Sequence, residues 1–260
     1  MQKQKIILFD FDGVIVDGID EYWHSSVLAC KGYLLSKELS SNQDYNLDVS
    51  EIFSYIRPWV KYGWEMVLIT HEIIKNTNPL TNKNKKNFLK NYSNSCQKIL
   101  EKNSWESTNL QIYLNNARHY QISNDFDKWI NLHRPYTDVI NFIRKAERSG
   151  FKIGIITTKK KIFTSKILEK FNIFPELIYG YESGTKVEIL TDLMTKYEIK
   201  CFIEDRRKTL IEIVRNPQTK DIKCFLADWG YLKDTDRLEL PKKVKLIKLK
   251  DLRNLLANSI

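Results

Sequence analysis

The sequence lacks any apolar run long enough to cross a membrane. Its first apolar stretch ends at Asp10, far short of the roughly 20 residues that a bilayer-spanning helix needs, and no longer apolar run follows. That stretch also does not have the pattern of a secretory signal peptide. We therefore expect a protein without a membrane partner.

The sequence is also poor in cysteine and has no CxxC pair. Its four cysteines lie far apart along the chain, which favours reduced core positions over disulfide bonds or a zinc site. Reduced cysteines are typical of the cytoplasm, and a cytoplasmic location is the prediction. The four positions are Cys30, Cys96, Cys201 and Cys224.

Acidic residues are in the minority, with 32 Asp and Glu against 42 Lys and Arg, so the net charge is +10. A positive balance favours anionic partners, which include phosphate esters, nucleic acids and acidic surfaces. Much of the excess lies in Lys- and Asn-rich stretches such as residues 75–91, which we interpret as solvated surface. Because no recognition-helix pattern, zinc-finger spacing or RNP-like motif accompanies the charge, nucleic-acid binding is not expected.

The composition of the chain and the order of its helical and strand-like stretches indicate a folded α/β protein. The 42% of hydrophobic and 28% of charged residues are ordinary for a globular chain, and 260 residues fit one large domain or two modest ones. From about residue 135 onward, amphipathic helical stretches such as TDVINFIRKAERSG alternate with strand-like ones such as FKIGIITT and KCFIED. This alternation predicts a doubly wound parallel sheet, Rossmann-like in architecture.

Residues 18–134 interrupt that alternation and read as helices. Five of the six tryptophans fall in this segment, so we expect it to have an apolar core of its own. We predict a catalytic core made of residues 1–17 and 135–260, with residues 18–134 inserted as an all-helical lid.

The opening stretch KIILFDFDGVIVDG raises a chemical question, because a buried strand ends in two acids. The run from Ile6 to Phe9 predicts a central strand, after which Asp10 and Asp12 would project to the same side. Two carboxylates this close repel each other unless a cation lies between them or one keeps its proton. An Asp-rich turn that caps the next helix is the alternative.

Polar residues also follow the other predicted strands. Since the carboxyl ends of parallel strands meet at one edge of the sheet, these side chains would converge in one crevice. Carboxylates, hydroxyls and a lysine together suit a divalent cation and a phosphoryl group. The residues at these strand ends are Asp10 and Asp12, then Thr157 and Thr158, then Lys186 in the loop ESGTK, and finally Glu204 and Asp205.

These stretches resemble the four ordered motifs of the haloacid dehalogenase superfamily, and the helical insertion is similar to its C1-type cap. The stretch DWGY at residues 228–231 resembles one common in the phosphoglycolate phosphatase-like branch. The resemblance implies that Asp10 is the nucleophile and that Asp12 is the general acid and base.

The resemblance also implies a set of binding roles. Mg²⁺ would be held by Asp10, the backbone carbonyl of Asp12, Asp205 and, directly or through water, Glu204. The transferring phosphoryl group would be bound by Thr157, Thr158 and Lys186.

The function predicted from these features is a magnesium-dependent phosphatase that acts on a small phosphorylated metabolite. The presence of Asp12 and of the acids in the fourth motif favours phosphate chemistry over carbon–halide cleavage. A phosphosugar mutase with the same motifs stays an alternative, as does a basic binding or scaffold protein with a vestigial site.

Several other polar residues carry weaker expectations. We expect Asp17 to cap the helix that follows it. The lysines at 159–161 are interpreted as a solvated run at a helix start. In the lid, the polar candidates for substrate contact are Arg57, Arg118 and His119.

Overall fold

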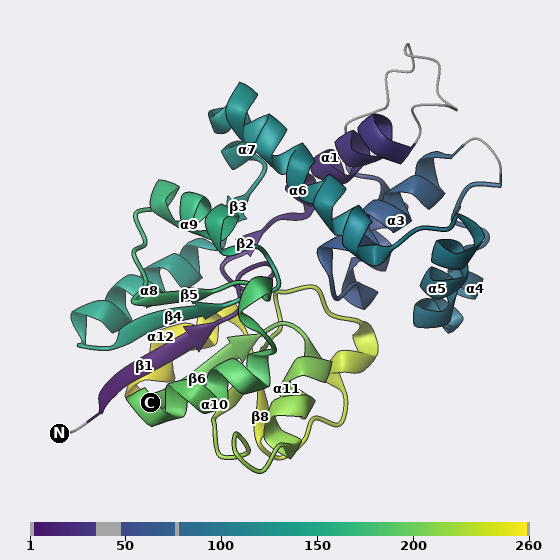
Figure 1. Ribbon diagram of the computed structural model, residues 1–260. Helices are drawn as coiled ribbons and strands as arrows, with labels where there is room; N and C mark the ends of the chain where they lie inside the picture. The colour runs from purple at the N-terminus through teal and green to yellow at the C-terminus, as the bar shows by residue number, and fades with distance from the viewer. Residues whose placement is uncertain (1–2, 35–47, 76–77, 259–260) are drawn as a thin grey trace. The chain divides into compact units, whose positions relative to one another are not determined.

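The computed structural model describes residues 3–34, 48–75 and 78–258 (Figure 1). The chain divides into two compact units. We call Met1–Asp17 with Arg134–Ile260 the core unit, and Gly18–His133 the helical unit.

The core unit is built on a six-stranded parallel sheet, which confirms the predicted α/β fold. The strand that opens the chain lies in the middle of the sheet, as the unbroken apolar run at 6–9 predicts. In spatial order the strands are β5 (Leu177–Tyr179), β4 (Lys152–Ile156), β1 (Gln4–Phe9), β6 (Tyr197–Glu204), β7 (Cys224–Ala227) and β8 (Val244–Ile247).

Alternation along β1 gives the sheet two apolar faces. Ile6 and Leu8 pack in one cluster with residues of α10 (Lys186–Lys196) and α11 (Arg207–Arg215). Phe9 points to the other face, where its ring meets that of Phe142 in α8 (Thr137–Arg148), 6.1 Å between centroids. Helices α9 (Lys161–Lys170) and α12 (Leu252–Asn258) complete this unit, together with the short 3₁₀ turns η3 (Tyr181–Ser183), η4 (Asp234–Arg237) and η5 (Leu249–Asp251).

A second, very small sheet lies where the chain passes between the units. It pairs β2 (Val16–Asp17) with β3 (Arg134–Pro135) in an antiparallel ladder. Because the helical unit begins at residue 18 and ends at residue 133, both chain crossings pass through this ladder.

The helical unit has its own apolar core, as the sequence predicts. Trp23 and Phe53 pack edge to face within it, with 5.2 Å between ring centroids. The stretch 51–69 is helical, but the extended residue Val60 interrupts it just after the turn that contains Pro58. The elements are α1 (Ile19–Ala29), η1 (Cys30–Leu34), α2 (Glu51–Ile56), η2 (Arg57–Trp59), α3 (Gly63–Ile74), α4 (Lys85–Lys90), α5 (Tyr92–Lys102), α6 (Ser107–Asn124) and α7 (Phe126–Asn131).

The structure also bears on the expectations drawn from the composition and from the apolar runs. All four cysteines are buried and unbonded, which agrees with core positions. In the Lys-rich stretch 75–91, Lys83, Lys86 and Lys90 are exposed, whereas residues 76 and 77 lie outside the described part of the chain. None of the described helices combines the length and the apolar character needed to cross a bilayer.

Candidate active site

Asp10 is the first residue after β1 and lies at the carboxyl end of the parallel sheet. Its backbone N–H donates to the carbonyl of Ile203, 2.8 Å away, which fixes the main chain against β6. Asp12 follows in a tight turn in which Gly13 has φ +85°, a conformation that favours glycine. Both side chains are almost entirely buried, at 7% and 5% exposure, so two acids do lie together in the interior.

Lys186 joins Asp10 to the acidic pair that ends β6. Its Nζ donates to Oδ1 of Asp10 at 2.6 Å and to Oε2 of Glu204 at 2.7 Å. Lys186 is the first residue of α10, and this helix begins there because Thr185 and Glu188 form a capping box. Burial lowers the pKa of Lys186, but the two carboxylates outweigh that effect and raise it, so the lysine is a permanent cation.

Asp205 completes a compact carboxylate cluster. One carboxylate oxygen each from Asp10, Glu204 and Asp205 lies within 4.8 Å of the others, and all three residues are buried. Asp205 fits only because two glycines face it. A Cβ on Gly13 would lie 2.1 Å from its Oδ2, and one on Gly230 would lie 2.2 Å from its Cβ.

The electrostatics of this cluster favour a bound cation. Burial, followed by the charge of Glu204, raises the pKa of Asp10 to about 7, and burial raises the pKa of Glu204 as well. Among the contacts that the structure describes, two lysines face the four acids of the site, so carboxyl groups outnumber cations there. Buried oxygen ligands with excess negative charge fit Mg²⁺, and the residues present therefore fit the metal that the sequence predicts.

Thr157 and Thr158 follow β4, as expected. Thr157 is buried, its N–H donates to the carbonyl of Tyr179, and its Oγ1 accepts the N–H of Lys159 at 3.1 Å. Thr158 is half-buried. Phe9 pairs with Ile155, so β1 and β4 are neighbouring strands. The hydroxyl of Thr157, just after β4, is thus held at the same edge of the sheet as Asp10, just after β1.

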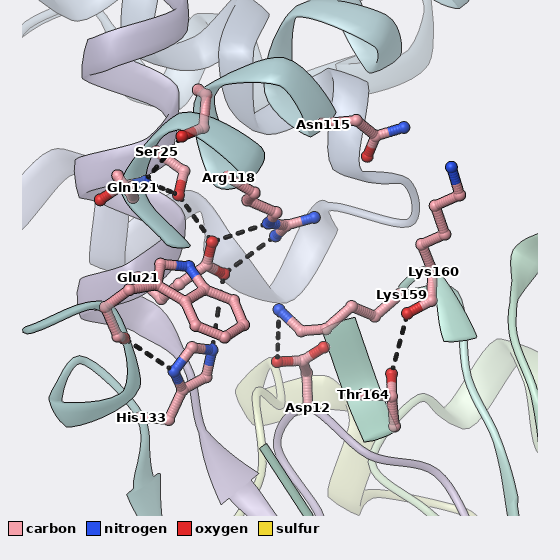
Figure 2. A network of polar contacts seen from close by, with 12 residues as sticks. Asp12, Glu21, Ser25, Asn115, Arg118, Gln121, His133, Lys159, Lys160 and Thr164 are labelled. Atoms are coloured by element: carbon pink, nitrogen blue, oxygen red, sulfur yellow. Dashed lines mark hydrogen bonds and ion pairs between the residues drawn. The ribbon is translucent and has the colours of Figure 1, made fainter. Parts of the chain in front are cut away.

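The expectation of a solvated lysine run is wrong for Lys159. Its side chain is fully buried, and its Nζ lies 3.4 Å from Oδ1 of Asp12 (Figure 2). Lys160 is half-buried and Lys161 is exposed, so only the first lysine belongs to the site. The sequence hides this because three successive lysines look alike, and only the fold turns one of them inward.

The prediction that Asp17 caps a helix is also wrong. Gly18 occupies the N-cap position of α1, and no side chain caps that helix end. Asp17 instead pairs with Arg134 across the β2–β3 ladder, and its Oδ1 accepts the hydroxyl of Tyr231 at 2.6 Å.

In the helical unit, Arg118 is held by an acid of the same unit. Its Nε and Nη2 donate to the two carboxylate oxygens of Glu21 at 2.7 and 2.9 Å, and both side chains are buried (Figure 2). Of the other lid candidates, Arg57 lies over the ring of Tyr22, 5.5 Å from its centroid, and His119 is exposed.

Comparison with known proteins assigns the family. A sequence model of haloacid dehalogenase-like hydrolases matches residues 4–206, more than half of the chain. The chain belongs to the haloacid dehalogenase-like hydrolase family. The predicted family resemblance is thereby confirmed, and the four motif regions of the site fall within the matched residues.

Solved structures share the fold over nearly the whole length. A predicted phosphatase from Clostridium acetobutylicum has a TM-score of 0.59 at 13% identity, and 99% of each chain is covered. A predicted phosphoglycolate phosphatase from Haemophilus somnus has a TM-score of 0.57 at 14% identity, covering 98% of this haloacid dehalogenase-like chain and 99% of the other. None of the curated proteins matches the sequence.

Proposed function

We propose that this haloacid dehalogenase-like hydrolase is a magnesium-dependent phosphatase that hydrolyses the phosphate monoester of a small metabolite. The observation that carries the proposal is the contact of Lys186 with Asp10 and Glu204, because it places a permanent cation on the candidate nucleophile inside an acidic cluster. A carboxylate that attacks a phosphate dianion needs such a charge beside it.

In the first step Asp10 attacks phosphorus and the bond from phosphorus to the ester oxygen breaks, giving an aspartyl-phosphate and an alcohol. Asp12 gives its proton to the departing alkoxide. In the second step Asp12, now a carboxylate, takes a proton from water, and the hydroxide attacks phosphorus. The bond to Asp10 breaks and inorganic phosphate leaves. Nζ of Lys159, 3.4 Å from Oδ1 of Asp12, would hold this residue in place for the second transfer, when Asp12 is a carboxylate.

Lys186, Thr157 and Thr158 would bind the oxygens of the transferring phosphoryl group. Asp10, Asp205 and Glu204 would hold Mg²⁺ together with the backbone carbonyl of Asp12. The metal supplies positive charge that offsets the phosphate dianion and the surplus of carboxylates. Asp12 has a separate task, since its carboxylate is not part of the three-acid cluster and faces Lys159.

We infer further that the helical unit acts as a cap that selects the substrate, in keeping with the C1-type caps that it resembles. The phosphoryl site takes only the phosphate end of a substrate, so the rest of the molecule must be read elsewhere. A small phosphorylated metabolite in the cytoplasm is the partner that fits, with the buried free cysteines supporting that location.

The test is hydrolysis of p-nitrophenyl phosphate by the purified chain with and without Mg²⁺, alongside Asp10→Asn and the control Asp192→Asn on the exposed face of α10. Metal-dependent turnover that only Asp10→Asn abolishes supports the proposal. Transfer of the phosphoryl group back to a phosphosugar, with little release of phosphate, would indicate a mutase. If Asp10→Asn kept both its turnover and its dependence on Mg²⁺, the mechanism would be refuted.

A further inference from the structure

The segment Asp228–Tyr231, which directly follows β7, contacts several other parts of the core unit. The indole Nε1 of Trp229 donates to the carbonyl of Val14 at 3.1 Å. The ring of Tyr136 packs against that of Trp229, with 6.4 Å between centroids. These contacts hold the segment against the turn after β1 and against the residue after β3.

Tyr231 contacts the carboxylate cluster through its backbone. Its N–H donates to Oδ2 of Asp205 at 2.8 Å. Gly230 leaves no space for a side chain at this point, because a Cβ there would also lie 2.7 Å from the carbonyl oxygen of Gly13. The Asp205 carboxylate is therefore oriented by a main-chain donor on one side and enclosed by two glycines.

Tyr231 contacts the chain crossing through its side chain. Its hydroxyl donates to Oδ1 of Asp17 at 2.6 Å, and Oδ2 of Asp17 lies 3.9 Å from Nη2 of Arg134. Asp17 and Arg134 are also paired residues of the β2–β3 ladder. One residue thus bonds both a carboxylate of the proposed metal site and the ladder through which the chain passes to and from the helical unit.

We propose that Tyr231 is a positioning residue with two separable tasks: its N–H orients Asp205 for metal binding, and its hydroxyl fixes the β2–β3 ladder at the chain crossing. The inference rests on the proposed function for its metal, but neither task needs turnover to be observed. The two tasks use different atoms: Tyr231→Phe removes only the hydroxyl, and Gly230→Ala displaces the Asp205 carboxylate on which the N–H acts.

Tyr231→Phe removes the hydroxyl and keeps the N–H. A hydrogen bond to a charged acceptor contributes enough that its loss is expected to speed amide exchange about tenfold in peptides that cover residues 14–17 and 134–136. Calorimetric titration with Mg²⁺ alone should give a dissociation constant within about twofold of the wild type, because loss of the Asp17 contact leaves the Asp205 donor in place. Tyr197→Phe, at the start of β6, is the matched control and should change neither quantity.

Gly230→Ala forces Asp205 to move, whereas a Cβ on Gly32 meets nothing within 4 Å. Substitutions around metal ligands typically cost about 10–100-fold in affinity, so Gly230→Ala should raise the Mg²⁺ dissociation constant at least about tenfold, and Gly32→Ala should not. Asp17→Ala removes the contact with Arg134 as well, so its amide exchange should be at least as fast as that of Tyr231→Phe, and the double variant should exchange no faster than Asp17→Ala.

Unchanged amide exchange in both Tyr231→Phe and Asp17→Ala would overturn the ladder task. Equal Mg²⁺ affinities of Gly230→Ala and Gly32→Ala would overturn the orienting task. A chain that hydrolyses no phosphate ester yet shows these exchange and affinity changes would refute the proposed phosphatase while supporting the role of Tyr231.

Discussion

Each unit of the chain buries a network of charged side chains, and the two networks differ in balance. In the helical unit, Glu21 accepts two hydrogen bonds from Arg118 and one from Ser25, whose Oγ in turn accepts from Gln121 (Figure 2). Arg118 meets the Glu21 carboxylate in bidentate geometry, and Nε2 of His133 lies 3.8 Å from Oε2 of the same carboxylate. The single acid of this network thus has a cation matched to it, and the pair links α1 to α6.

In the network of the core unit, by comparison, carboxyl groups outnumber the lysines that face them. Four carboxyl groups, from Asp10, Asp12, Glu204 and Asp205, share two lysines. Burial raises the pKa values of Asp10 and Glu204, and the charge of a neighbouring acid, Glu204 for Asp10 and Asp205 for Glu204, raises each further although Lys186 opposes it. A buried network with surplus charge destabilises the folded chain unless something of opposite charge binds, and this difference distinguishes a site from a structural pair.

The largest expected effect is on catalysis, from Asp10→Asn. Loss of the nucleophile should lower turnover of p-nitrophenyl phosphate by about 10⁴-fold or more. The thermal midpoint of the metal-free variant should be no lower than that of the wild type, because the substitution removes surplus charge and keeps an acceptor for Lys186. Turnover within tenfold of the wild type would contradict the assignment of Asp10 as the nucleophile. A lower thermal midpoint would contradict the excess of negative charge in the buried cluster.

The opposite result is expected in the balanced network. Arg118→Met leaves Glu21 buried without its cation, which typically costs about 3–5 kcal/mol in the free energy of unfolding. Urea unfolding followed by tryptophan fluorescence measures this cost, since five of the six tryptophans are in the helical unit. The double variant Glu21→Leu with Arg118→Met should recover part of the loss, and a double variant as unstable as the sum of the single ones would contradict the pairing.

Lys159→Met tests whether the buried lysine belongs to the site. Without its partner 3.4 Å away, Asp12 loses the charge that holds it for proton transfer, and kcat should fall about 100-fold, within the range of general acid–base contributions. Lys161→Met changes an exposed lysine two residues away and is the control. Equal kcat values for the two variants would show that Lys159 serves packing alone.

These residues also show what could be predicted from the sequence. The strand ends that bear Asp10, Asp12, Glu204 and Asp205 follow from short apolar runs that stop at acids, a local pattern. The structure confirms the sheet that brings these strand ends to one edge.

The residues that the sequence did not reveal depend on distant partners. Lys159 is buried against an acid 147 residues earlier in the chain, and the partner of Asp17 is a tyrosine hydroxyl 214 residues later. The pair of Glu21 with Arg118 spans 97 residues. A run of lysines, or an acid before a helix, fits a local explanation equally well, so only tertiary contacts decide such positions.

The smallest expected effect is the pH dependence of stability, which compares the two networks in one protein. The pKa of Asp10 rises from an ordinary 3.8 to about 7 on folding, so between these values the folded chain binds more protons than the unfolded chain. The stability that Asp10 contributes is therefore full below about pH 4 and is lost as pH rises through 7. Mg²⁺ competes with that proton, so it should raise the thermal midpoint more at pH 8 than at pH 6, by a few degrees.

The pair of Glu21 with Arg118 is the control for this pH dependence. It lies in the other network, so Arg118→Met should leave the Mg²⁺ effect and its pH dependence unchanged. An Mg²⁺ shift that is equal at both pH values, or that persists in Asp10→Asn, would show that the metal binds elsewhere than at this cluster.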